Sequence, residues 1–346
     1  MKLAIVGAFG GTHIGGSLAR GAQSLGIEAV CIDTAGASQG PRALQSLRWR
    51  LADHQPLRLH RFSQSVVELC RRERPDVLVA TGAAPLTAAA LQTLRAAGVA
   101  LVNYSTDDPW SASNGSAWHR RALPHYDIVF SPRQANLGDL KALGCADVRY
   151  LPFGYDEMLF APPDGPCEGA APDVLFVGGA DRDRMQFMRG FVEAGAPVTL
   201  VGGYWEKLAD SRVQALGLKE PDSLRALTAC AKVNLCLVRK ANRDGHVMRS
   251  FEIAAVRGCM LAEDTAEHRA IFGGDGECVV YFRGPSDAAA SALALMADPR
   301  ERARLASSAH ERIIAGRHTY RDRLSTMLEV ACGRREPSFG AISARP

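Results

Sequence analysis

Three charged residues fall within one short stretch in the C-terminal half of the chain. Asp244, Arg249 and Glu252 lie between Asn242 and Ala255, directly after the apolar run Val233 to Val238. This order predicts a strand, a polar loop containing a glycine, and then a helix whose first turns carry charge. Carboxylates accept hydrogen bonds from hydroxyls, while an arginine and the amides at a helix start bind phosphate. We therefore predict a site here for a sugar joined to a diphosphate.

A second junction between a predicted strand and a predicted helix lies earlier in the same half. The apolar run ends at Gly178, and Arg182 and Arg184 follow at the expected helix start. An arginine there can hold a diphosphate and stabilise the charge that grows on a departing nucleoside diphosphate. Arginine alternates with aspartate in this segment, which is equally typical of a surface salt-bridge pattern.

Two carboxylates and an aromatic residue follow a predicted strand in the N-terminal half. Asp107, Asp108 and Trp110 come after the apolar run that ends at Asn103, and His119 lies further along. A carboxylate or an imidazole at this place can orient or deprotonate a hydroxyl group. An aspartate that only caps a helix fits the same pattern equally well.

A glycine-rich loop follows the first predicted strand. It includes Gly10, Gly11 and His13, and such a loop lets backbone amides approach an anion. Its spacing departs from GxGxxG, but Asp33 stands where dinucleotide enzymes have a ribose-binding acid. An NAD(P)-dependent oxidoreductase using the loop Gly7 to Gly16 and Asp33 is therefore an alternative, although no Tyr-x-x-x-Lys set accompanies it.

Strands alternate with helices along both halves, which predicts where these loops lie. The alternation restarts at residue 173, after a segment at 161–172 that is rich in proline and glycine, and it includes a helical region through Leu216. Such a pattern is typical of parallel sheets covered by helices, whose ligands bind beyond the carboxyl ends of the strands. The predicted fold class is α/β, with two Rossmann-like domains facing a cleft.

Composition excludes several classes of protein. The net charge of +4 over 346 residues comes without a face of interleaved basic and aromatic residues, so we expect no nucleic-acid partner. Nine cysteines without a CxxC pair suggest reduced thiols and a cytoplasmic protein. The uncharged run at 77–94 is broken by Gly82 and Pro85, and the N-terminus lacks the order of a signal peptide, so no transmembrane segment is expected.

Several of these segments together resemble one family. The stretch Arg249-Ser250-Phe251-Glu252-Ile253-Ala254-Ala255, leading to Gly258, is similar to the CgeB-like (spore-maturation type) branch of the group 1 glycosyltransferases. Three earlier segments occur in the order expected for that branch: Asp107-Asp108-Pro109, Tyr155-Asp156, and Phe176-Val177-Gly178 with Arg184. The resemblance covers most of the chain from about residue 100 to 325.

The resemblance implies a GT-B fold and transfer of a sugar from a nucleoside-diphosphate sugar to an unknown glycan, protein or small-molecule acceptor. It implies no cofactor, no metal, and retention of the anomeric configuration. Domain 1–160 would take the acceptor and domain 161–318 the donor. The helix at 319–332 would cross back to the first domain, and the tail 333–346 would be disordered.

The same resemblance assigns roles to residues. Glu252 would bind the ribose and Asp244 the hydroxyls of the donor sugar. The diphosphate would be held by Arg249, Arg184, Arg182, Gly178, Gly245 and His246. Catalytic candidates on the acceptor side are His119, Asp107 and His13, with Gly10, Gly11, Asp108 and Trp110 lining the cleft.

Two positions depart from the family pattern. Asp244 replaces the usual glutamate, and Arg257 stands where the family often has a glycine. Either change could alter the choice of donor or weaken the enzyme. A non-catalytic nucleotide-sugar-binding protein is therefore the third interpretation.

Overall fold

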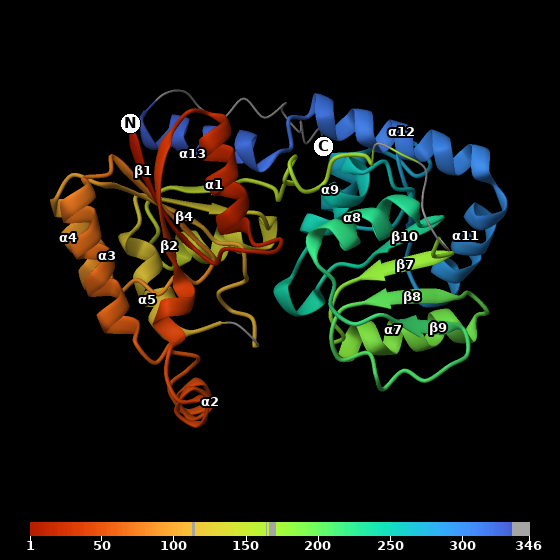
Figure 1. Cartoon of the computed structure of the whole chain (residues 1–346), viewed down its shortest axis with the longest axis horizontal. Coiled ribbons are helices and arrows are strands. Elements are labelled where there is room, and N and C mark those ends of the chain that lie inside the picture. Colours follow the sequence, from red (N-terminus) through yellow and green to blue (C-terminus); the bar gives the residue numbers. More distant parts are fainter. Residues whose placement is uncertain (113–114, 164, 166–170, 334–346) are drawn as a thin grey trace. The chain divides into compact units, whose positions relative to one another are not determined.

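The chain forms two compact units (Figure 1). The computed structural model describes residues 1–112, 115–163, 165 and 171–333, and only the backbone of Arg42. Of the described residues, the first unit contains Met1–Pro152, Ala241–Asp244 and 320–333, and the second contains Phe153–Lys240 and Gly245–Thr319. The predicted tail after residue 333 and part of the predicted linker 161–172 lie outside the described residues.

A parallel sheet of six strands forms the centre of the first unit, in the order β2-β1-β3-β4-β5-β6. Its central strands are nearly fully buried because helices pack on both faces, as parallel sheets require. The strands are β1 (Lys2–Gly7), β2 (Glu28–Asp33), β3 (Val77–Thr81), β4 (Ala100–Tyr104), β5 (Ile128–Ser131) and β6 (Val148–Tyr150). The α-helices are α1 (Ile14–Ser24), α2 (Arg42–Leu51), α3 (Leu59–Glu73), α4 (Ala88–Ala96), α5 (Ala117–Ala122), α6 (Leu137–Ala142) and α13 (Tyr320–Ala331). Short 3-10 turns are η1 (Thr34–Ser38), η2 (Leu123–His125) and η3 (Gln134–Asn136).

The second unit repeats this architecture, with the strand order β12-β11-β10-β7-β8-β9 and parallel pairing throughout. Its strands are β7 (Val174–Val177), β8 (Val198–Val201), β9 (Val213–Ala215), β10 (Val233–Cys236), β11 (Met260–Glu263) and β12 (Val280–Phe282). Its α-helices are α7 (Arg182–Glu193), α8 (Pro221–Cys230), α9 (Met248–Ala255), α10 (Ala266–Phe272), α11 (Pro285–Ala297) and α12 (Pro299–Ala315). The 3-10 turn η4 (Lys240–Asn242) follows β10. The main core of this unit gathers large side chains from β7, α7 and α11 against Trp205.

The predicted class, α/β with parallel sheets, is confirmed, but one element is wrong. The region before Leu216 is not helical and forms the edge strand β9. Val213 pairs with Val198 of β8, and Leu216 N donates to Leu200 O at 2.9 Å. Pairing along the sheet edge satisfies these backbone groups and overrides the helical pattern. Helices α2 and α3 occupy a stretch where the sequence predicted no element.

The last described helix packs against the first helix of the chain. In the first unit α13 lies along α1, and a Cβ atom on Gly21 would come within 3.0 Å of Arg321 Cα. Arg323 of α13 is fully buried, and its Nε donates to Pro152 O at 2.8 Å. The two ends of the chain are therefore joined in one unit.

The prediction that all cysteines are reduced thiols holds at seven described positions and fails at one. Seven are free thiols, at positions 31, 70, 145, 236, 259, 278 and 332, as predicted. Cys230 is instead disulfide-bonded, so the expectation of reduced thiols is wrong at that position. In the described part of the chain no helix is both long and apolar enough to cross a bilayer.

Candidate active site

In the charged stretch that follows β10, helix α9 begins only after Asp244. The helix begins at Met248, so Asp244 precedes it and Arg249 and Glu252 lie in its first turns. Glu252 lies three positions after Arg249, which places both on one side of the helix. Arg249 Nη1 lies 2.5 Å from Glu252 Oε2, and the guanidinium also lies over the ring of Phe160.

Glu252 is a buried carboxyl group. Its side chain is 3% exposed, and burial raises its pKa, with the Arg249 cation lowering it and Asp156 raising it further. Although Arg249 Nη1 and Glu252 Oε2 are close, neither makes a hydrogen bond of normal geometry to any described residue. Buried polar atoms in proteins are nearly always hydrogen-bonded. These two atoms form an ion pair with each other, and neither has a further hydrogen-bond partner among the described residues.

Arg184 follows the neighbouring strand β7. It lies in the first turn of α7, where its Nη1 donates to Gly179 O at 3.3 Å and its guanidinium lies over the ring of Phe176. Burial raises the pKa of the Cys236 thiol to about 11, and the cations of Arg249 and Arg184 both lower it. Because Cys236 is the last residue of β10, both cations act on the carboxyl end of this strand.

The approach of Arg184 leaves little room at the end of β7. A Cβ atom on Gly178 would lie 3.0 Å from the Phe176 ring and 3.3 Å from Arg184 Nη1. Trp205 is 1% exposed and donates through Nε1 to Gly178 O, which fixes this turn. Arg182, the other predicted arginine, is exposed.

A buried network fixes the start of α9. Ser250 Oγ accepts from Val247 N at 3.3 Å and lies 2.8 Å from His268 Nε2. His268 Nδ1 donates to Glu263 O at 2.8 Å, so its Nε2 accepts the Ser250 hydroxyl proton. Burial lowers the pKa of His268 to about 4, which keeps the ring neutral near pH 7. This network holds Arg249 and Glu252 in place without touching either.

Gly245 and His246 were predicted to offer backbone amides, and the structure gives the His246 side chain a separate task. The ring is fully buried, with Nδ1 2.6 Å from Glu267 Oε2 and Nε2 accepting from Phe153 N at 3.0 Å. A Cβ atom on Gly245 would lie 2.5 Å from the carboxyl carbon of Glu267. Only glycine fits there, because the histidine and the glutamate must meet.

Asp244 belongs to the first unit, where it forms an ion pair with Arg133. Both side chains are nearly inaccessible, at 4% and 2% exposed. Arg133 Nη2 also donates to Thr106 O at 2.8 Å. The acid predicted to hold the sugar hydroxyls is thus engaged with a cation.

Asp108 is in the same situation. Arg243 donates to both of its oxygens, at 2.6 and 3.0 Å, and Asn136 Nδ2 donates at 2.8 Å. Burial by itself would raise the pKa of Asp108, but these hydrogen bonds and the amide of Trp110 lower it. Asp108 is therefore ionised and its acceptor positions are occupied.

The other candidate residues of the first unit differ in burial and in their contacts. His119 is buried, its pKa is lowered to about 4 by burial and by Arg120, and its Nδ1 bonds to no described residue. Asp107 is partly exposed, and Trp110 packs against the core and Arg243. The loop after β1 keeps His13, Gly10 and Gly11 exposed.

Sequence reasoning missed several residues that organise these loops. Arg133 and Arg243 pair with the predicted acids, and His268, Glu263 and Glu267 support α9. A signal existed for His268, which follows the strand after the charged stretch. None existed for Arg133, which lies 111 residues from its partner. Within the described residues, no group of three or more His, Cys, Asp and Glu side chains is arranged to hold a metal ion.

A known family matches the part of the chain that contains this site. Residues 183–329 match the model of a family described as glycosyl transferase-like. Residues 183–329 are thus similar to a glycosyltransferase domain, and Arg184, Arg249 and Glu252 lie within this match. Direct sequence comparison with curated proteins finds no match.

Solved structures agree on the fold of the whole chain. Sucrose-phosphate synthase from Thermosynechococcus elongatus is 14% identical, with a TM-score of 0.68 over 97% of this chain and 100% of that one. HepE from Anabaena, in complex with UDP-glucose, is 16% identical, with a TM-score of 0.65 over 95% and 100%. A protein from Listeria monocytogenes assigned as a UDP-N-acetylglucosamine 2-epimerase is 13% identical, with a TM-score of 0.57 over 96% and 97%.

Identities this low show the fold alone, and that fold is GT-B. Because an epimerase shares it, the fold does not choose between reactions on a nucleotide sugar. The family match of residues 183–329 is what favours transfer.

Proposed function

We propose that the protein transfers a sugar from a nucleoside-diphosphate sugar to an acceptor, without a metal ion and with retention of configuration. The observation that carries the proposal is that the cations of Arg184 and Arg249 both act on the carboxyl end of β10, where Arg249 pairs with the buried Glu252. Two cations at one strand end suit a diphosphate, and a buried carboxylate beside them suits the ribose hydroxyls. The family match covers all three residues.

The proposed chemistry follows from these groups. The bond between the anomeric carbon and the diphosphate oxygen breaks, the acceptor hydroxyl oxygen bonds to that carbon, and the hydroxyl proton passes to the departing diphosphate oxygen. Negative charge grows on the departing nucleoside diphosphate, where Arg184, Arg249 and the amides at the start of α9 stabilise it. These groups supply positive charge without a metal, which is the basis for proposing metal independence.

The finer assignments are proposals as well. We assign the chain to the CgeB-like branch on the order of its segments, and Asp244 to the donor sugar hydroxyls. That role requires Asp244 to share or leave its ion pair with Arg133. His119, Asp107 and His13 stay the candidates on the acceptor side. The cytoplasm stays the proposed compartment, supported by seven free thiols.

A ligand panel tests the donor class. Thermal unfolding is followed with UDP-, GDP- and dTDP-sugars and, in parallel, with NAD(H) and NADP(H), because a ligand bound only to the native state raises the melting temperature. We expect stabilisation by one nucleotide sugar and its nucleoside diphosphate. Stabilisation by a dinucleotide alone would overturn the proposal in favour of the oxidoreductase.

Product analysis separates the reactions. With the stabilising nucleotide sugar, we expect release of the nucleoside diphosphate that falls strongly in Glu252→Gln and is unchanged by a chelator. Interconversion of the sugar without release would indicate an epimerase. Tight binding without turnover across a panel of acceptors would indicate a non-catalytic binder.

A further inference from the structure

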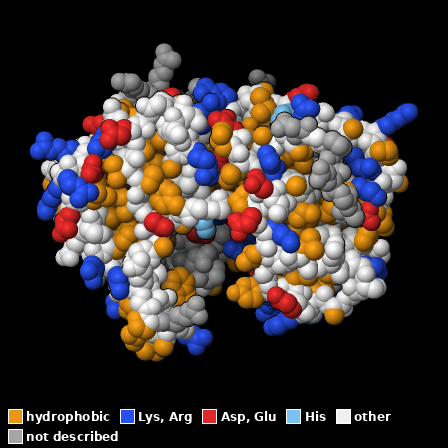
Figure 2. Space-filling view, viewed as in Figure 1, with side chains coloured by type: hydrophobic (Ala, Val, Ile, Leu, Met, Phe, Trp, Pro, Cys, Tyr) orange, Lys and Arg blue, Asp and Glu red, His pale blue; other side chains and the backbone are white. Residues whose placement is uncertain are grey.

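Helix α2 of the first unit leaves large apolar side chains in solvent. Leu44, Leu47 and Leu51 are 51, 54 and 77% exposed, and Trp49 is 47% exposed. Eleven large hydrophobic side chains are exposed in the described chain, and four of them lie within these eight residues. Figure 2 shows hydrophobic side chains gathered where α2 lies, with basic side chains beside them. Such clustering marks an interaction site, whereas single exposed leucines do not.

The three leucines form one stripe. Spacings of three and four residues bring Leu44, Leu47 and Leu51 to the same side of a helix with 3.6 residues per turn. Arg48 falls on one edge of this stripe and Arg50 on the other. An apolar stripe flanked by arginines is the pattern of a helix that lies in a membrane interface.

The net charge of the segment around the helix is positive. Residues 39–61 include five arginines and one aspartate, a net charge of +4 that equals the net charge of the entire chain. Arg50, His60 and Arg61 are exposed, while Arg48 and Arg58 are half-buried. A surface so charged complements anionic headgroups and repels a basic partner.

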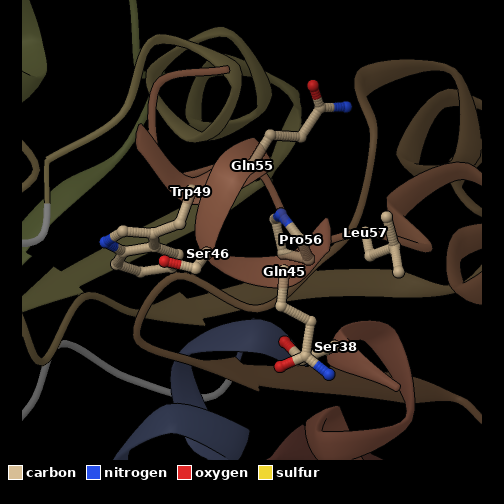
Figure 3. A pocket seen from close by; sticks show the side chains of 7 residues that line it. All are labelled: Ser38, Gln45, Ser46, Trp49, Gln55, Pro56 and Leu57. Atoms are coloured by element: carbon tan, nitrogen blue, oxygen red, sulfur yellow. The ribbon is translucent and has the colours of Figure 1, made fainter. Parts of the chain in front are cut away.

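Trp49 lies on a different side of the helix from the leucine stripe. It borders a cavity of about 320 Å³ that is lined also by Gln45, Pro56 and Leu57 and by no charged residue (Figure 3). The centroid of its ring also lies 4.7 Å from that of the His54 ring, so the indole packs on the protein and is not part of the leucine stripe.

We propose that α2 docks the first unit on the surface of an anionic lipid bilayer. The leucine stripe enters the boundary between headgroups and acyl chains, while Arg48, Arg50 and Arg58 face lipid phosphates. No membrane-spanning helix is needed for this attachment, which is peripheral and reversible. The proposal is independent of the transfer reaction, because it concerns a surface of the first unit alone.

Sedimentation with vesicles tests the docking. The full chain is mixed with vesicles of phosphatidylglycerol and phosphatidylcholine, and separately with phosphatidylcholine vesicles. We expect at least about tenfold stronger binding to the anionic vesicles, and weaker binding as salt is raised, because exposed charges are screened. Equal binding to both vesicles, or none to the anionic ones, would overturn the proposal.

A matched pair of variants tests the helix itself. Leu44→Ser/Leu47→Ser/Leu51→Ser should lose about tenfold or more of the binding. The control Leu218→Ser/Leu293→Ser/Ile314→Ser removes three exposed side chains from the second unit and should bind like the wild type. Circular dichroism and the melting temperature establish that both variants fold. If both triple variants bind equally well, α2 is not the docking surface.

Two further readouts distinguish the partner. Arg48→Gln/Arg50→Gln should reduce binding to anionic vesicles and flatten its salt dependence. Sedimentation velocity without lipid checks for a second copy: self-association that the leucine variant abolishes, with no vesicle binding, would assign α2 to a protein interface and refute lipid docking.

Discussion

The predicted acids of the two units differ in how many of their oxygen atoms accept hydrogen bonds. In the first unit Asp244 and Asp108 are each paired with an arginine, and their oxygens are occupied by hydrogen bonds. In the second unit Glu252 is equally buried, yet its Oε2 and the neighbouring Arg249 Nη1 have no normal hydrogen bond among the described residues. Both sets follow strands of parallel sheets. What separates them is how fully their polar atoms are satisfied.

This difference distinguishes structural polar groups from groups available to a ligand. A satisfied buried ion pair holds loops together, and its removal leaves an uncompensated charge. An unsatisfied pair is costly for folding and is tolerated where binding completes it. The first unit's acids should therefore affect stability more than activity, and the second unit's the reverse.

The largest expected effect is on folding of the first unit. Arg133→Met leaves Asp244 buried without its cation, which should lower the free energy of unfolding by roughly 3–5 kcal/mol. Urea unfolding measures the loss. The double variant Arg133→Met/Asp244→Asn removes the orphaned charge and should recover a substantial part. If the double variant instead shows the sum of two separate losses, Asp244 is not stabilised by Arg133.

The second prediction concerns activity of the second unit. Arg249→Ala should reduce kcat/KM for transfer by roughly 10²–10³-fold, because a cation that stabilises the leaving diphosphate is lost. The control Arg189→Ala removes an exposed arginine from α7, the helix that carries Arg184, and should leave the rate unchanged. A similar rate loss in both variants would mean that general charge matters and not the position of Arg249.

Acid stability compares one buried histidine in each unit. Burial lowers the pKa values of His119 and His268 to about 4, below the unfolded value near 6.5. Between these values the unfolded chain binds more protons, so stability is full above about pH 6.5 and falls as the pH drops towards 4. Each ring should contribute roughly 2–3 kcal/mol to this loss.

Urea unfolding at several pH values measures that slope. His268→Gln retains a donor and an acceptor without titrating, and His119→Gln does the same in the first unit. Each variant should flatten the decline between pH 6.5 and 4. A decline that neither variant changes would assign acid sensitivity to the carboxylates.

The smallest effect compares two arginines with left-handed backbones. Arg243 (φ 51°) uses its side chain to bind Asp108, whereas the side chain of Arg257 (φ 57°) makes no hydrogen bond or ion pair within the described residues. Arg257 N donates to Ala254 O and Gly258 N to Ile253 O, a helix end that favours glycine at the arginine's position.

Substitution by glycine should therefore have opposite signs. Arg257→Gly should raise the free energy of unfolding by about 1 kcal/mol, while Arg243→Gly should lower it. Arg257→Ala, which keeps the Cβ atom, is the control and should give little of the gain. The melting temperatures rank the three variants, and a loss on Arg257→Gly would mean that the arginine side chain has a stabilising contact.

Local patterns predicted most of the fold, and the site residues remain a prediction. Apolar runs of strand length alternating with helical patterns were enough for two parallel sheets, because both signals are local. The position of Arg184, Arg249 and Glu252 after strands brought them together, since parallel strands end at one edge of a sheet. The edge strand β9 was missed because its pairing with β8, and not its own pattern, decides its conformation.

Pairings between distant segments were not predictable from these patterns. Arg133 reaches Asp244 across 111 positions, and His246 meets Glu267 only because Gly245 leaves room for the glutamate. A charged residue after a strand looks the same in sequence whether its partner is a protein cation or a ligand. The structure adds the identity of the partner.

The contact between α1 and α13 has a consequence for synthesis of the chain. Residues 1–152 emerge from the ribosome first, but the side of α1 beside Gly21 is covered only by α13, which is made roughly 170 residues later. At about 5–20 residues per second this delay is on the order of 10–30 s. During that interval the face of α1 beside Gly21 is exposed to solvent, and the first unit is completed only when α13 has been translated.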